Sequence, residues 1–200
     1  MTTASSQANP STPRSSIIDV AVRLFGQQGY TGTSMRDIAK SVGVLPGSLY
    51  AHIDSKETLL VEIVDDGITS FFSAVEPIVA GDQPPEQKLR AAIRAHVAVV
   101  AQNPERSLVV FHQWRFLGEP HLGAAIEKRR RYEQAYIRVV NEGVERGVFD
   151  RRLNVRIAVL TILGALNWTP EWYSPVGPAT PEQLGDRIAD TLLGGLVTRS

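Results

Sequence analysis

The sequence contains no cysteine, which excludes disulfide bonds, thiolate metal sites and cysteine nucleophiles. It has no long uncharged apolar run, so no segment is predicted to span a membrane. It also has no net charge, because 21 Lys and Arg balance 21 Asp and Glu. A neutral chain still binds nucleic acid if the local field at the contact is favourable. With 200 residues, of which 43% are hydrophobic, the chain is predicted to be globular with a substantial core.

Motifs of enzyme active sites are missing as well. The sequence has no Gly-x-Ser-x-Gly, no His-Glu-x-x-His and no phosphate-binding glycine loop. His96, His112 and His121 lack the i, i+4 spacing of a helical metal site. We therefore expect no catalysis, no metal and no cofactor. Residues 1–12 carry no charge and no apolar run, so they are not a secretory signal, and a cytoplasmic protein is expected.

Apolar residues recur at helical spacing along the chain, and no alternating strand pattern is found. The pattern predicts an all-α protein with about nine helices, while the polar residues 1–12 are expected to be disordered. A capping box of Asp54 and Glu57 is expected to open a long helix, and Gly29 and Gly147 are expected to end helices. The predicted helices are 13–28, 34–41, 45–51, 55–80, 85–102, 103–117, 121–146, 154–168 and 181–197.

The segment from 34 to 53 has the spacing of two short helices that cross over a tight turn. Ala39 is small where the second helix would cross the first, and Gly43 follows four residues later in the turn, where a positive φ is needed. Leu49 follows six residues after the glycine and would face inward. These features predict a helix-turn-helix.

The same residues resemble a known family. Gly29-Tyr30, the run Thr-Ser-Met-Arg-Asp-Ile-Ala at 33–39 and residues 42–57 are similar to the N-terminal domain of TetR-family transcriptional regulators. The resemblance implies a homodimer with one helix of each subunit in a major groove of a palindromic operator. It also implies a DNA-binding domain over 13–58, after the tail 1–12, and a ligand-binding and dimerisation domain over 59–200.

In that role, the helix within 45–51 would lie in the groove, where small residues let the backbone approach the DNA. Thr33 would stand at a helix start, where free N–H groups favour an anion, and Lys56 at the start of the long helix would reach phosphate for the same reason. Ala51 departs from the family pattern, so the bases that are read stay open. The DNA-binding candidates are Thr33, Arg36, Leu45, Gly47, Ser48, Tyr50, His52 and Lys56.

Four of these candidates have plainer explanations. Tyr50 would alternatively cover the core of the small domain, and His52 would be an ordinary surface histidine. Arg36 would alternatively pair with a nearby acid, and Lys56 would be a solvated residue of the capping turn.

The last two predicted helices combine apolar and small residues, such as Leu160 and Gly164 in the first and Leu192 and Gly194 in the second. Small residues permit close helix approach, so paired copies would form a four-helix interface across a two-fold axis. The alternative is that both helices belong only to the core of one subunit.

Aromatic residues of the second half indicate a ligand pocket or, alternatively, ordinary core. Trp168 and Trp172 share a face around Pro170, which would bend the helix and open a cavity. Arg115 lies four residues after Phe111 and would pair with an anionic ligand group or with an internal acid. The ligand-binding candidates are Phe71, Phe111, Trp114, Arg115, Tyr136, Asn167, Trp168 and Trp172.

Residues 163–177 resemble the C-terminal region of TetR regulators that respond to acyl-CoA thioesters. The basic run 128–131 would hold the phosphates of such a ligand, or is a solvated helix face. The expected function is a repressor that a small hydrophobic effector, such as an acyl-CoA, releases from operator DNA. Alternatives are another aromatic or hydrophobic ligand, or a constitutive DNA-binding dimer without a sensor.

Overall fold

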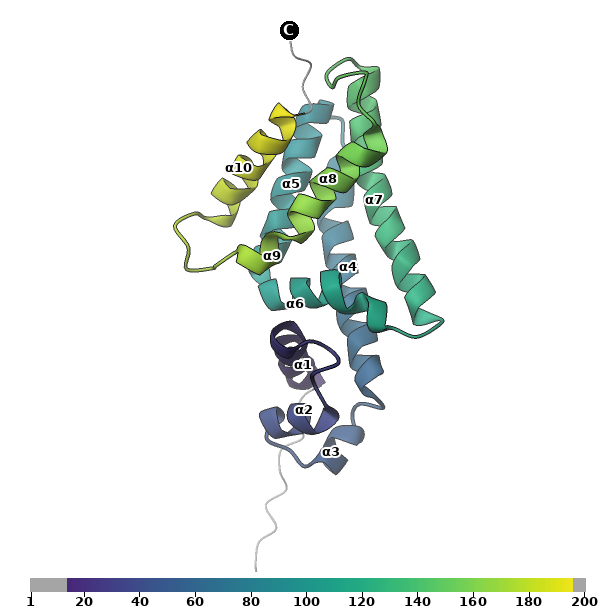
Figure 1. The fold of residues 1–200 in the computed structure, drawn as a ribbon, viewed down its shortest axis with the longest axis vertical. Helices are drawn as coiled ribbons and strands as arrows, with labels where there is room; N and C mark the ends of the chain where they lie inside the picture. The colour runs from purple at the N-terminus through teal and green to yellow at the C-terminus, as the bar shows by residue number, and fades with distance from the viewer. Residues whose placement is uncertain (1–13, 196–200) are drawn as a thin grey trace, which may run out of the picture.

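The computed structural model describes residues 14–195, which form helices and contain no strand (Figure 1). The all-α class predicted from the apolar spacing is confirmed. The predicted tail 1–12 and the predicted end of the last helix at 197 lie outside the described residues. The α-helical segments in this part of the chain are α1 (Arg14–Gln28), α2 (Met35–Val42), α3 (Pro46–Tyr50), α4 (Lys56–Ala80), α5 (Pro85–Gln102), α6 (Pro104–Leu108), α7 (His121–Glu145), α8 (Val155–Asn167), α9 (Thr169–Trp172) and α10 (Pro181–Gly194).

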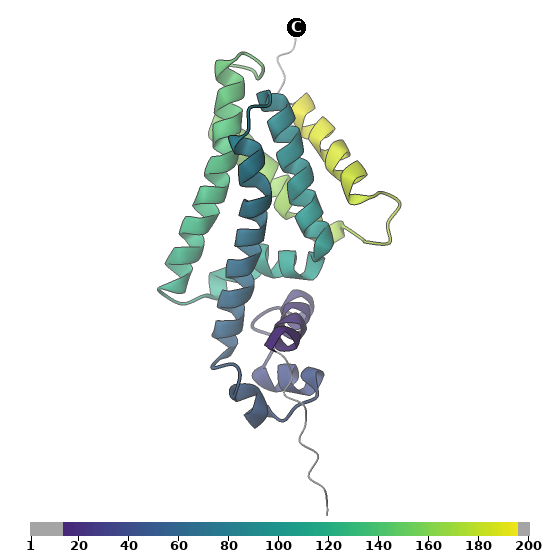
Figure 2. The ribbon, with the colours of Figure 1, turned by 180° about the vertical axis from the view of Figure 1, so that it is seen from behind.

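Helices α1 to α3 form a small unit at one end of the molecule, as both ribbon views show (Figures 1 and 2). Helix α4 starts beside this unit and continues into the larger helical body, where it packs against α5 and α7. Its 25 residues make it about 37 Å long at 1.5 Å per residue. Helix α10 packs along α5, and α8 packs on α7. None of the helices within 14–195 is both long and apolar enough to cross a bilayer.

The helix-turn-helix forms because its capping and packing residues agree. Ser34 caps α2 by accepting a hydrogen bond from the backbone N–H of Asp37, whose carboxylate accepts one from the Ser34 N–H in return. Gly43 ends α2 with φ of 82°, and its N–H donates to the carbonyls of Ala39 and Lys40. Ala39 and Leu49 are fully buried where α2 and α3 meet. The predicted motif is therefore built as the spacing requires.

Two local expectations were wrong. The N-cap of α4 is Ser55, whose side chain accepts from the Thr58 N–H, and Asp54 has no capping role. Glu57 instead accepts a hydrogen bond from the Gly118 N–H at 2.8 Å. The predicted helix 103–117 is also not uniform, because the five-residue α6 continues as a π-helical turn, Val109–Gln113, and a 3-10 turn, Trp114–Phe116.

This irregular segment, residues 109–116, connects the small unit to the body. The side chain of Gln113 accepts a hydrogen bond from the Tyr30 N–H at 3.0 Å. The ring of Phe116 stacks on Tyr30, with the ring centres 5.7 Å apart. Just before it, Glu105 in α6 accepts a hydrogen bond from Gln27 at the end of α1. The two parts of the molecule are therefore joined by side-chain contacts as well as by α4.

Candidate nucleic-acid interface and ligand cavity

Helix α3 lies at the end of the molecule away from the helical body (Figure 1). It exposes apolar side chains there. Leu45, its N-cap residue, is 76% exposed, and Tyr50 is 53% exposed. Only Leu49 on α3 is buried, so it anchors the helix while its neighbours face outward. Large apolar side chains that are exposed on a helix at the end of a molecule indicate a contact surface.

The other outward-facing candidates are Arg36 on α2, Gly47 and Ser48 on α3, and His52 just after it, all of which are exposed. Arg36 forms no ion pair with a carboxylate of residues 14–195, so the alternative that it pairs with a nearby acid is not found. The exposure of Tyr50 likewise contradicts the alternative that it covers the core. These side chains are free to meet a partner.

Thr33 and Lys56 are placed differently from the other candidates. The Thr33 hydroxyl is buried and lies 2.9 Å from the Gly29 carbonyl oxygen and 3.3 Å from that of Leu24, so it is held within the small unit, and the anion contact expected at this helix start stays a prediction. The Lys56 ammonium donates to the carbonyls of Tyr30 and Thr33, each at 2.8 Å, and lies 4.1 Å from the Tyr30 ring centre. An ammonium has three donors, so one remains available to an anion. Tyr30, which the sequence analysis named only for the family resemblance and not as a site residue, positions this lysine.

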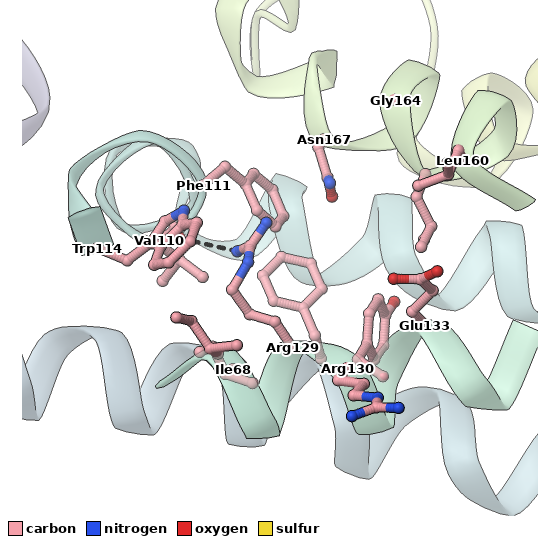
Figure 3. A pocket seen from close by; sticks show the side chains of 14 residues that line it. Ile68, Val110, Phe111, Trp114, Arg129, Arg130, Glu133, Leu160, Gly164 and Asn167 are labelled. Carbon is pink, nitrogen blue, oxygen red and sulfur yellow. Dashed lines mark hydrogen bonds between the residues drawn. The ribbon is translucent and has the colours of Figure 1, made fainter. Parts of the chain in front are cut away.

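A cavity of about 420 Å³ lies between α4, the 109–116 segment, α7 and α8 (Figure 3). This volume is within the range of small-molecule sites. Its wall is mainly apolar, and its rim includes the exposed residues Ile126, Arg130, Leu160 and Gly164. The lining residues are Ile68, Phe71, Val110, Phe111, Trp114, Ile126, Arg129, Arg130, Tyr132, Glu133, Leu160, Leu163, Gly164 and Asn167.

The back of the cavity is an aromatic cluster. The rings of Phe71 and Phe111 lie 5.0 Å apart, and His96 stacks on Phe111 from behind with ring centres 5.6 Å apart. Burial lowers the pKa of His96 to about 3, so its ring is neutral at physiological pH. Its Nδ1 is hydrogen-bonded to the Tyr132 hydroxyl at 2.9 Å. Burial also raises the pKa of Tyr132 well above 10, so this pair is uncharged.

Arg129 brings a positive charge into the cavity wall beside Phe111 and Trp114 (Figure 3). Its guanidinium donates to the Val110 carbonyl at 3.3 Å and lies 4.8 Å from the Trp114 ring centre (Figure 3). Burial lowers the pKa of Arg129, and the nearby positive charge of Arg115 adds to the shift. Within the basic run 128–131, Arg129 and Arg130 line the cavity, while Lys128 and Arg131 form ion pairs with Asp65 and Glu127.

The structure brings together half of the sequence-predicted ligand residues. Phe71, Phe111, Trp114 and Asn167 line the cavity. The other four predicted ligand residues do not line the cavity: Arg115, Tyr136, Trp168 and Trp172.

Each of these four is placed elsewhere for an identifiable reason. Arg115 is exposed because the π-helical turn before it breaks the i, i+4 spacing from Phe111. Tyr136 is fully buried behind Tyr132 and donates to the Ala92 carbonyl. Trp168 and Trp172 are 57% and 51% exposed, because α8 ends at Asn167 and α9 turns both side chains outward.

These tryptophans belong to an exposed apolar face that follows α8 and α9. Ile157 and Leu160 on α8 are 58% and 46% exposed, and Gly164 on the same helix is also exposed. Soluble monomers rarely leave several large apolar side chains exposed along one element, so this face indicates a contact with another protein surface. Since Leu160 and Gly164 also line the cavity, the cavity opens toward the same face.

Family models match most of the chain. Residues 17–63 match the model described as bacterial regulatory proteins, tetR family, and residues 82–196 match that of the tetracyclin repressor-like C-terminal domain. The second match alone covers more than half of the 200 residues.

Individual proteins are similar over nearly their whole length. The transcriptional repressor KstR2 of Mycobacterium tuberculosis strain H37Rv is 27% identical over 186 residues, covering 92% of each chain. The structure of the ketosteroid transcriptional regulator KstR2 of that organism superposes with a TM-score of 0.87 at 26% identity, covering 93% of this chain and 95% of the other. The structure of AibR with isovaleryl coenzyme A and operator DNA has a TM-score of 0.78 at 27% identity, covering 92% and 97%.

Proposed function

Because the chain belongs to the TetR family of bacterial regulatory proteins, we propose that it is a transcriptional repressor that binds a palindromic operator as a homodimer in the cytoplasm. A small hydrophobic effector, an acyl-CoA thioester in the first instance, releases it from DNA. The unit of α1 to α3 binds DNA, and the helical body from α4 onward binds the effector and the partner subunit.

The exposure of α3 is the observation that supports the DNA-binding part of the proposal. Leu45 and Tyr50 are apolar or aromatic, exposed and carried by a helix that its own subunit leaves uncovered. The major groove admits one helix, and an apolar side chain such as Leu45 contacts the thymine methyl group there. Tyr50, His52 and Lys56 donate hydrogen bonds to phosphates and so fix the orientation of α3.

The exposed apolar face of α8 and α9 supports the dimer, in which α8 and α10 of each copy form the four-helix interface expected from the sequence. A two-fold axis at this face would bury Ile157 and Leu160 against the same side chains of the second copy, as an isologous interface requires. Operator palindromy then follows from the protein symmetry, with half-sites one turn of B-DNA apart, about 34–36 Å.

The cavity and the 109–116 segment support control by an effector. Val110 and Phe111 line the cavity, while Gln113 in the same π-helical turn holds the Tyr30 backbone, and Tyr30 holds Lys56. A ligand that displaces this turn therefore changes the contacts that position the DNA-binding unit. The ligand shifts the population only by its preference for one of the two arrangements.

An acyl-CoA is the first candidate because AibR, a structural relative, has been solved with isovaleryl coenzyme A. The cavity of about 420 Å³ suits an acyl group, and Arg129 and Arg130 in its wall would bind the phosphates of coenzyme A. Another hydrophobic or aromatic molecule is the alternative effector. A dimer without a sensor is the alternative function, and it predicts that no ligand of the cavity changes DNA affinity.

The test uses the full-length protein and fluorescently labelled DNA from the region upstream of its own gene. Fluorescence anisotropy is expected to show sequence-dependent, salt-sensitive binding that a series of acyl-CoA thioesters reduces. The variant Gln113→Ala is expected to bind DNA but to respond more weakly to the effector, because the Tyr30 contact is lost. Absence of specific DNA binding refutes the repressor, and binding that no acyl-CoA or hydrophobic compound alters supports the dimer without a sensor.

A further inference from the structure

The cavity wall has an excess of hydrogen-bond donors at one end. The guanidinium of Arg129 carries five N–H donors, and the structure gives it one acceptor, the Val110 carbonyl at 3.3 Å. Its ring contact with Trp114 satisfies no N–H donor in the guanidinium plane. The indole Nε1–H of Trp114, in the same wall, is buried and has no acceptor within residues 14–195.

No negative charge balances this end of the cavity. No carboxylate in the described part of the chain forms an ion pair with Arg129. Glu133 also lines the cavity, but its carboxylate lies toward Leu160, away from the Arg129 guanidinium (Figure 3). Burial lowers the pKa of Arg129, and the positive charge of Arg115, which has the same sign, lowers it further. A partly buried arginine without an anion is costly, because its desolvation is not compensated.

We propose that the cavity selects amphipathic acids, and that Arg129 binds the carboxylate- or phosphate-type oxygens of the ligand while Phe71, Phe111 and Leu163 contact its apolar body. The inference deepens the proposed function, because it assigns a chemical class to the effector of the same cavity. A guanidinium binds such oxygens with two parallel hydrogen bonds, and the low polarity of the surrounding wall strengthens them.

The proposal accounts for the position of Arg129 between the cavity and the 109–116 segment. Its one protein hydrogen bond is to Val110, within the π-helical turn. An anion that binds the free N–H donors of Arg129 acts on the same guanidinium that holds this turn. The charge of the ligand therefore affects the 109–116 segment, which also contacts Tyr30.

Two fluorescent probes with the same rings test the proposal on the full-length protein. 1-Anilinonaphthalene-8-sulfonate carries an anionic group, and N-phenyl-1-naphthylamine does not. The wild-type protein is expected to bind the anionic probe more tightly. The variant Arg129→Gln is expected to weaken that binding about tenfold to a hundredfold, and to leave the neutral probe unchanged. Arg131→Gln, which removes an exposed arginine two residues away, is the matched control and is expected to change neither.

A cavity-filling variant and a displacement assay test where the probes bind and which anionic group is preferred. Leu163→Trp fills the cavity and is expected to abolish binding of both probes. Displacement of the anionic probe by decanoate or by decyl phosphate, with decanol as the neutral control, distinguishes a carboxylate from a phosphate ligand. The proposal would be overturned if Arg129→Gln weakened binding of both probes equally, or if the wild type bound both probes with equal affinity. It would also be overturned if either probe still bound to Leu163→Trp. Operator binding, measured separately by anisotropy, shows whether the repressor function itself holds.

Discussion

Replacing Lys56 with methionine is expected to affect both the stability of the DNA-binding unit and the salt dependence of operator binding. The substitution removes two charge-assisted hydrogen bonds, to the carbonyls of Tyr30 and Thr33, and the contact with the Tyr30 ring. The side chain is partly exposed, so we expect a loss of about 2 kcal/mol in the free energy of unfolding. The third N–H donor of the ammonium is the one available to a DNA phosphate.

The salt dependence follows from the number of phosphates. Each neutralised phosphate contributes about 0.9 to the slope of log K against log salt, so two Lys56 side chains in a dimer contribute about 1.8. Raising the salt concentration fourfold should then weaken the variant about 12-fold less than the wild type. The assay is fluorescence anisotropy at several salt concentrations, with thermal unfolding measured in parallel.

Lys128→Met is the matched control, because Lys128 pairs with Asp65 on the helical body. It should leave the slope unchanged. A Lys56→Met protein with reduced stability but an unchanged slope would refute the phosphate contact. One with unchanged stability would refute the role of the two carbonyl contacts.

Three further predictions concern the core, the DNA-binding unit and the dimer. The pKa of an unfolded histidine is near 6.5 and that of His96 is about 3, so the unfolded state binds more protons between these pH values. The free energy of unfolding, measured by denaturant titration, should therefore fall by about 2 kcal/mol from pH 7 to pH 5. This loss should nearly disappear in His96→Gln but persist in the exposed control His121→Gln. Leu49→Ala leaves a cavity under α3 and should cost about 2–5 kcal/mol in unfolding experiments, with weaker operator binding; full stability would contradict the packing. Ile157→Glu should give a folded monomer by circular dichroism and analytical ultracentrifugation, and a persistent dimer would exclude the α8 face as the interface.

The helices and the DNA-binding motif were predictable because their signals are local. Gly43 and Ser34 fix the ends of α2 through short-range contacts, and Leu49 is identified by spacing alone. The resemblance to the TetR family, carried by the same residues, is confirmed by the family models. The cap of α4 was misassigned because Asp54 and Ser55 are adjacent and both are good capping residues.

The cavity was predicted only in part, because its walls are set by tertiary packing. Phe111 and Trp114 were identified as an aromatic cluster, but the spacing argument for Arg115 assumed a regular helix where the chain forms a π-helical turn. Trp168 and Trp172 were expected at a cavity because they share a helix face around Pro170, whereas α9 turns them outward. The basic run 128–131 was noticed, but only the fold shows that Arg129 and Arg130 line the cavity while Lys128 and Arg131 form ion pairs outside it.

The most direct test of the account is a footprint of the dimer on DNA from the region upstream of its gene. We predict a protected palindrome whose half-site centres lie about 10 base pairs apart, bound by one or more dimers, with protection lost in a variant that carries Leu45→Asp and Tyr50→Asp on α3. Uniform protection without a palindromic site, or a footprint that this α3 variant leaves unchanged, would contradict the claim that α3 of two symmetric subunits reads the operator.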